Sequence, residues 1–268
     1  MKWKNIYRGM AMGVSDVVPG VSGGTIAVLL GFYNQLIAAI NGLFTREWKK
    51  HLGFLIPLGI GMALAIFSFS RLMDWLLNYY EQPTYYFFIG LIIGILPYLF
   101  RESDARNKFK WQHVLLLFVG IFLISRLNIS PDEGAIITDR SFSIYLLLFF
   151  SGFIASAAMI LPGISGSLVL VVIGVYKTVI NAVSTFDFTV IIIVGIGIAL
   201  GIITMSKVIH YFLRNYQTAT FALIIGLVIG SVFVIFPGWT SNVTQLTLCI
   251  VLFALGLIVA YVLGKVEY

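Results

Sequence analysis

The sequence predicts an all-α polytopic membrane protein of two inverted-topology repeats, each a Pro/Gly-broken helical hairpin plus three transmembrane helices. Two observations support this prediction. The chain is 60% hydrophobic and only 10% charged, with a mean hydropathy of +1.01, far too little charge to cover a soluble domain. Similar segments also recur at a nearly constant spacing. The expected partner is therefore the membrane bilayer and not nucleic acid, although the formal net charge is +6.

The recurrence is clearest at a Pro-Gly-x-Ser-Gly motif, which occupies residues 19–23 and returns in the second half of the chain at 162–166. Two further echoes follow at a slightly shorter spacing: 59–64 matches 195–200, and 89–94 matches 225–230. Paired apolar segments that are interrupted by Gly and Pro in both halves of a chain are typical of transporters whose site lies between the repeats.

The two motifs interrupt apolar stretches at residues 5–41 and 142–183. Proline and glycine do not continue a helix there, so each stretch is predicted to form a hairpin with the break at its tip, either re-entrant or fully crossing. Repeat 1 is assigned to residues 1–135 and repeat 2 to residues 136–268, together one integral membrane domain. The remaining spans are expected at about 53–77, 84–100, 112–127, 188–205, 218–236 and 246–263.

The basic residues test the inversion. A hairpin returns to its starting side, so each half makes three net crossings and the second half begins on the opposite face. With this topology 13 of the 17 Lys and Arg residues fall on one face, and only Arg71, Arg126, Arg140 and Lys177 fall on the other. The positive-inside rule therefore makes the first face cytoplasmic and predicts that both termini lie there.

Each broken tip is predicted to bind an anion. A helix that begins after the Pro-Gly break has backbone N–H groups without intrahelical partners, and its dipole favours negative charge. Two such tips that meet near the midplane would hold one phosphate-like group, although the glycines could instead serve tight helix packing. The predicted phosphate-binding residues are Ser15, Pro19, Gly20, Ser22, Gly23, Gly24, Thr25, Pro162, Gly163, Ser165, Gly166 and Ser167.

Charged residues near the tips are candidates for coupling and guidance. An ionisable residue as deep as Asp16 is costly, so it is predicted to carry a coupling proton or sodium ion; the alternative is an N-cap or a partner for Arg8 or for another buried donor. Arg71, Lys177 and Lys207 are predicted to guide an anionic headgroup, against the alternative that they only snorkel to the interface.

The remaining residues predict no catalytic site, metal site or cofactor. The three histidines lie at segment ends without metal-ligand spacing, and the chain has neither a nucleotide-binding loop nor a catalytic-triad pattern. The single cysteine, Cys249, excludes an intramolecular disulfide.

At residues 15–25, Ser-Asp-Val-Val-Pro-Gly-Val-Ser-Gly-Gly-Thr, the chain resembles the DUF368 membrane family, and the likeness covers essentially its whole length. The resemblance implies a PopT-like polyprenyl-phosphate transporter. Such a flippase would return undecaprenyl or polyprenyl phosphate from the outer to the inner leaflet of the bacterial cytoplasmic membrane, recycling the lipid carrier of cell-wall biogenesis.

Two alternatives remain at this point. Undecaprenyl-pyrophosphate phosphatases carry a similar Pro-Gly-x-Ser tip, but Gly23 and Gly166 stand where their arginine would be, and no glutamate falls within a predicted span. Hydrolysis without those groups is poorly supported, so no enzyme is predicted. A transporter of a small soluble anion would use the same tips with an aqueous path.

Overall fold

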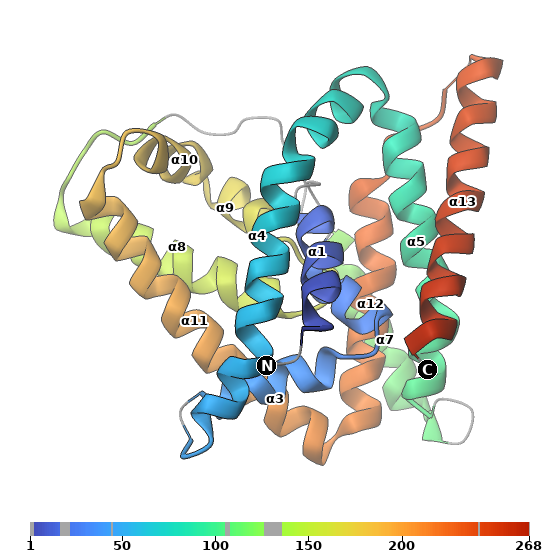
Figure 1. Ribbon diagram of the computed structural model, residues 1–268, viewed down its shortest axis with the longest axis horizontal. Coiled ribbons are helices and arrows are strands. Elements are labelled where there is room, and N and C mark those ends of the chain that lie inside the picture. The colour runs from blue at the N-terminus through green and yellow to red at the C-terminus, as the bar shows by residue number, and fades with distance from the viewer. Residues whose placement is uncertain are drawn as a thin grey trace.

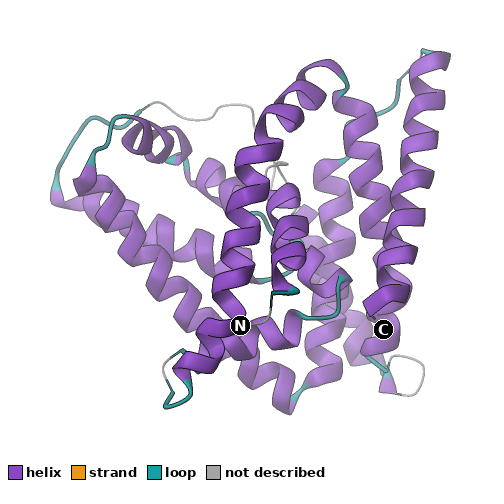
Figure 2. Cartoon of the chain, viewed as in Figure 1, coloured by secondary structure: helices purple, strands orange, loops and turns teal. Residues whose placement is uncertain are grey.

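The computed structural model describes residues 3–16, 22–43, 45–104, 108–125, 136–240 and 242–267. Within these residues all regular secondary structure is helical (Figure 2). The helices of the first half are α1 (Asn5–Asp16), α2 (Gly23–Leu29), α3 (Tyr33–Gly42), α4 (Trp48–Tyr79), α5 (Glu81–Glu102) and α7 (Trp111–Ser125). Those of the second half are α8 (Phe142–Ile160), α9 (Gly166–Ile173), α10 (Tyr176–Ser184), α11 (Phe188–Asn215), α12 (Gln217–Ile235) and α13 (Val243–Glu267).

The lengths of these helices confirm a multi-pass membrane protein. Among the described residues, six helices (α4, α5, α8, α11, α12 and α13) are long and apolar enough to cross a bilayer. The predicted span at 112–127 corresponds to α7, which is apolar but has 15 described residues, about 22 Å at 1.5 Å per residue. Large apolar side chains such as Phe67, Phe118 and Tyr261 are exposed on the outside of the bundle, as expected where lipid covers the surface.

Each predicted hairpin contains a second bend, which was not predicted from the sequence. After the first tip, α2 and α3 meet at 118°, and after the second tip, α9 and α10 meet at 114°. Glycine makes both bends, since Gly31 has φ 62° and Gly174 has φ 83°, a left-handed conformation that side chains disfavour. Each hairpin is therefore one helix before the tip and two short helices after it.

Four helix pairs form most of the bundle (Figure 1). In the first half α1 packs along α4, and in the second half α8 packs along α11. The other two pairs join the halves, because α5 packs along α13 and α12 packs along α7. Apolar residues cover the whole circumference of α12, and the helix is buried along most of its length, which places it in the core.

The two ends of the bundle differ. The start of α1 and the end of α13 lie at the lower end in Figure 1, which also holds α3 and the turn between α11 and α12. The upper end holds α10 and the turn between α4 and α5. At the lower end α3 contacts both α4 and α11, and toward the upper end these two long helices are drawn apart in Figure 1.

Close helix approach depends on glycine at matched positions. A Cβ on Gly90 of α5 would overlap the carbonyl oxygen of Phe253 on α13. Its counterpart in the second half, Gly226 of α12, would in the same way overlap the carbonyl oxygen of Leu117 on α7. Small residues allow membrane helices to pack backbone against backbone, so these glycines set the distance between the two halves.

Gly226→Leu is therefore expected to lower the free energy of unfolding by about 3 kcal/mol or more, because the Leu117 carbonyl belongs to a helix backbone and cannot move aside alone. The thermal unfolding midpoint of the purified protein in detergent measures the effect. Gly195→Leu is the matched control, since a Cβ at Gly195 has no neighbour within 4 Å. Equal midpoints for the two variants would contradict the close approach of α7 and α12.

Candidate functional site

The first tip ends in a short helix whose first amides are already bonded. Ser22 has an extended backbone (φ −114°, ψ 133°) and caps α2, with its side chain accepting a hydrogen bond from the N–H of Gly24 at 3.2 Å. The N–H of Gly23 donates to Oδ1 of Asp16, the last residue of α1, at 2.6 Å. Asp16 thus links the end of α1 to the start of α2. The predicted residues Pro19 and Gly20 lie outside the described residues.

The two tips contact each other directly. The N–H of Gly163 donates to Oγ1 of Thr25 at 2.8 Å, joining the second tip to the first turn of α2. Gly163 has φ 90°, and a Cβ there would lie 2.7 Å from the carbonyl oxygen of Leu227. Gly24 faces the last carbonyls of α8, and the hydroxyl of Tyr33 donates to one of them, that of Ile160, at 3.1 Å. Residues predicted at both tips are therefore neighbours.

The remaining predicted tip residues make local contacts. The hydroxyls of Ser165 and Ser167 are 2.8 Å apart, at the start of α9. Pro162 is buried, and Gly166 faces the carbonyl of Ala155 on α8. Ser15 is buried and donates to the carbonyl of Met12 at 2.7 Å within its own helix.

A cavity of about 240 Å³ begins at the first tip. Its polar end is formed by the Asp16 carboxylate with the backbone of Gly23 and Gly24, and Asp16 is the only charged residue among the described residues that line it. The rest of the wall is apolar and comes from α1, α3, α4, α8 and α11: Met12, Leu36, Ile37, Ile40, Leu55, Leu58, Gly59, Met62, Met159, Ile160 and Ile202. The cavity thus has a short polar end and a long apolar wall.

At the polar end of the cavity, the Asp16 carboxylate already accepts the hydrogen bond that a bound anion would accept. An oxygen of Asp16 stands where an oxygen of a bound phosphate would accept the Gly23 amide. An ionised carboxylate and a phosphate would repel each other at that distance. A phosphate can therefore take this amide only when Asp16 releases it or loses its charge. In this structure Asp16 is thus the partner of the buried Gly23 amide, whereas the N-cap of α2 is Ser22.

The three predicted guiding cations do not line the cavity. Arg71, Lys177 and Lys207 are exposed and lie on α4, α10 and α11. Lys207 follows the lining residue Ile202 by five residues, about 7.5 Å along α11 toward the lower end. Arg71 follows the lining residue Met62 by nine residues, about 13.5 Å along α4 toward the upper end.

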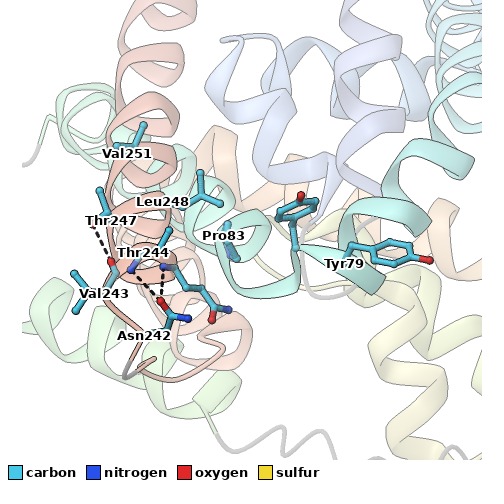
Figure 3. A pocket seen from close by; sticks show the side chains of 10 residues that line it. Tyr79, Pro83, Asn242, Val243, Thr244, Thr247, Leu248 and Val251 are labelled. Carbon is cyan, nitrogen blue, oxygen red and sulfur yellow. Dashed lines mark hydrogen bonds between the residues drawn. The ribbon is translucent and has the colours of Figure 1, made fainter.

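A larger hollow, of about 750 Å³, lies at the upper end between the α4–α5 turn and the start of α13 (Figure 3). Tyr79, Tyr80 and Pro83 form one side, and seven residues between 242 and 251 form the other, where the side chain of Asn242 accepts hydrogen bonds from the first amides of α13. The described residues of its lining include no charged side chain. The smaller cavity is therefore the better candidate for an ionic ligand.

Several residues of the cavity were not predicted from the sequence. Met12, Gly59 and Met62 line it, and Tyr33 ties α3 to the end of α8. Tyr33 had a detectable signal, because the alignment that pairs the two motifs also pairs it with another tyrosine, Tyr176. Among the described residues no group of three or more His, Cys, Asp or Glu side chains could hold a metal ion.

Comparisons with known proteins point to a transporter. Residues 12–250 match the family described as VCA0040-like, undecaprenyl phosphate translocase-like. The polyprenyl-phosphate transporter of Staphylococcus aureus (strain NCTC 8325 / PS 47) is 45% identical over 99% of this chain and 97% of its own length. That of Vibrio cholerae serotype O1 is 34% identical over 91% of this chain and 80% of its own length. No solved structure matches the chain. Both relatives are named as transporters, which confirms the prediction of a transporter instead of an enzyme.

Proposed function

Because the chain belongs to the undecaprenyl phosphate translocase-like family, we propose that it transports a polyprenyl phosphate such as undecaprenyl phosphate across the membrane. The flippase moves the lipid from the outer to the inner leaflet of the bacterial cytoplasmic membrane, so that the carrier is recycled for cell-envelope synthesis. The observation that carries this proposal is the shape of the cavity at the first tip, where one ionisable end is followed by an apolar wall.

That wall favours a lipid over a small soluble anion. A soluble anion needs polar groups along its whole path, because charge in an apolar environment is strongly disfavoured. Beyond Asp16 and the two glycines, the cavity offers methionine, leucine and isoleucine side chains. An amphiphile with a phosphate at one end and an isoprenoid chain behind it satisfies both parts of the wall.

The phosphate binds in this proposal where the tips meet. Ser22, Gly23, Gly24 and Thr25 hold it from the first repeat, and Ser165, Gly166 and Ser167 from the second. The Thr25–Gly163 contact supports this arrangement, since it brings both tips to one place. Asp16 gives up the Gly23 amide to the substrate and takes up a proton or sodium ion in exchange, which couples the two movements. Lys207 below the cavity and Arg71 and Lys177 above it attract the headgroup.

We also propose that the two halves are inverted repeats. The packing of α1 on α4 and of α8 on α11 supports this, as does the reciprocal pairing of α5 with α13 and of α12 with α7. A pseudo-two-fold axis in the membrane plane produces such matched pairs. The lower end is assigned to the cytoplasm, because exposed cations such as Lys110, Lys207 and Arg214 belong to it.

The test uses the purified protein in proteoliposomes that carry undecaprenyl phosphate. A membrane-impermeant phosphatase added outside removes only the headgroups of the outer leaflet. We expect the protein to make the inner-leaflet lipid accessible, so that the phosphatase hydrolyses nearly all of the undecaprenyl phosphate. In protein-free vesicles hydrolysis should stop when about one half of the lipid is consumed. Vesicles with undecaprenyl pyrophosphate should release no inorganic phosphate without the added enzyme. A plateau near one half with active protein would refute lipid transport, and phosphate release would indicate an enzyme.

A further inference from the structure

The parts of the two halves that follow the tips are packed very differently. Leu29 in α2 is 2% exposed, whereas Val172, its counterpart in α9 when the two motifs are aligned, is 48% exposed. Ile37 in α3 is 1% exposed, and its counterpart Ile180 in α10 is 51% exposed. The long helix pairs are matched between the halves, as described above. The asymmetry is thus confined to the short helices, α2–α3 on one side and α9–α10 on the other.

The short helix α3 joins α4 to α11 at the lower end of the cavity. Leu36, Ile37 and Ile40 of α3 line the cavity there. At the end of α3, the side-chain amide of Asn41 donates to the carbonyl oxygen of Ser206 on α11 at 2.8 Å. The hydroxyl of Ser206, fully buried, lies 3.4 Å from Oδ1 of Asn41. Two polar contacts therefore hold α3 on α11.

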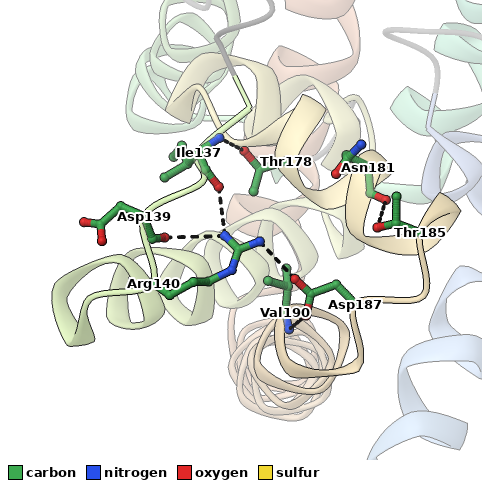
Figure 4. Close-up of polar contacts among 8 residues, drawn as sticks. All are labelled: Ile137, Asp139, Arg140, Thr178, Asn181, Thr185, Asp187 and Val190. Atoms are coloured by element: carbon green, nitrogen blue, oxygen red, sulfur yellow. Dashed lines mark hydrogen bonds and ion pairs between the residues drawn. The ribbon is translucent and has the colours of Figure 1, made fainter.

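The equivalent helix of the second half, α10, does not join α11 to α4 in this way. It packs on α11, as α3 packs on α4, but among the described residues it forms no interface with α4 comparable to that of α3 with α11. It is held instead at the upper end (Figure 4). The hydroxyl of Thr178 on α10 accepts from the N–H of Ile137 at 3.0 Å. Nearby, Arg140 before α8 pairs with Asp187 before α11 at 2.9 Å, a contact that does not involve α10.

We propose that α3 and α10 are the two gates of the transporter and that the Asn41–Ser206 contact is the latch of the cytoplasmic gate. This inference rests on the proposed inverted repeats. The structure then represents the state that is closed toward the cytoplasm, with α4 and α11 spread at the outer end. In the opposite state α3 leaves α11, and α10 crosses to α4.

The alignment of the two halves identifies where the outer gate closes. The alignment that pairs residues 19–23 with 162–166 pairs Asn41 with Ser184, at the end of α10. The alignment that pairs 59–64 with 195–200 pairs Ser206 with Ser70, on α4. These positions are the counterparts of the latch, so their backbones approach each other only when α10 lies on α4. A disulfide forms only when two Cα atoms come within about 7 Å, which makes cysteine pairs a direct reporter of each state.

The experiment compares two cysteine pairs in membranes, each in a Cys249→Ala background that removes the native cysteine. The pair Asn41→Cys/Ser206→Cys should cross-link readily and stop transport until reductant is added. The pair Ser70→Cys/Ser184→Cys should cross-link slowly and stop transport in the opposite state. Adding Asn41→Ala to the second pair should raise its cross-linking rate by about five-fold or more, because the latch that holds the first state is lost.

Matched variants separate the latch from helix stability. Asn215→Ala is the control for Asn41→Ala, since both side-chain amides donate within their own helix, Asn41 to the carbonyl of Ile37 and Asn215 to that of Tyr211. A second change, Ser206→Ala, removes the hydroxyl that lies 3.4 Å from Asn41. Its control is Ser231→Ala, because both serines are buried and both also donate within their own helix, Ser206 to Ile203 and Ser231 to Val228. Neither control should change the cross-linking rate of the Ser70→Cys/Ser184→Cys pair.

The outcomes distinguish the gate from the substrate. Full transport by the cross-linked Asn41→Cys/Ser206→Cys protein would overturn the gate, and so would a Ser70→Cys/Ser184→Cys pair that never cross-links even with Asn41→Ala. Cross-linking needs no substrate. If both cysteine pairs cross-link as expected but no polyprenyl phosphate is transported, the proposal of two gates is supported and the proposed substrate is refuted.

Discussion

Asp16→Asn is expected to slow transport of the lipid phosphate by about ten-fold or more while leaving the protein folded, a factor that corresponds to about 1.4 kcal/mol. Asparagine has nearly the same shape and keeps an oxygen that can accept from the Gly23 amide. It cannot ionise or exchange a proton or sodium ion, so the proposed coupling is lost. Transport should be measured in proteoliposomes across a range of pH and sodium concentration, where the variant should lose the dependence that the unmodified protein shows.

Asp187→Asn provides the matched control for this change. Asp187 is also a carboxylate that accepts from the first turn of a helix, at the amide of Val190, but it lies outside the cavity. Its replacement should leave the ion dependence of transport unchanged. If Asp16→Asn transports at the normal rate under every ionic condition, Asp16 has no part in coupling and serves the fold alone.

Gly59→Leu is expected to block transport with little effect on stability. Gly59 lines the cavity, and a Cβ there meets no atom within 4 Å, so a leucine fits without moving the backbone. Its side chain would fill part of a space of about 240 Å³ and exclude the substrate. We expect transport to fall by about ten-fold or more, as a loss of about 1.4 kcal/mol in binding would produce. The thermal unfolding midpoint should stay within a few degrees of the original.

Ala254→Leu tests whether added bulk alone slows the protein. Ala254 is exposed on α13 and takes no part in lining the cavity. Its replacement should leave transport near the original rate. Equal loss in both variants would point to disturbed contacts with lipid, and normal transport by Gly59→Leu would remove this cavity from the substrate path.

Local chemistry explains which parts of the fold were predictable from the sequence. Proline and glycine do not continue a helix, so the end of a helix before each Pro-Gly-x-Ser-Gly motif and the start of another after it were predictable. The bends at Gly31 and Gly174 have the same origin, and the two glycines are matched when the motifs are aligned. They were missed because one glycine in an apolar run usually serves helix packing, and only its φ value distinguishes a bend.

The site was harder to predict because its contacts join distant parts of the chain. Ser22 and Gly23 were named as candidates because they begin a helix, and Asp16 because it is an ionisable residue in an apolar segment. Thr25 and the Gly163 amide, in contrast, come from opposite halves of the chain, and nothing local to either residue indicates their hydrogen bond. The apolar wall of the cavity was invisible for the same reason, since Met62 and Ile202 resemble any other apolar residue of a membrane helix.

The reciprocal pairing of α5 with α13 and of α7 with α12 has a consequence for how the protein is made. Because α13 is synthesised only after all the helices between it and α5, the glycine face of α5 stays without its partner through most of translation. The first half inserted alone would expose that face to lipid or to other chains. Completion of the bundle is therefore a late step of biogenesis, and truncation anywhere before α13 leaves the N-terminal half unfinished.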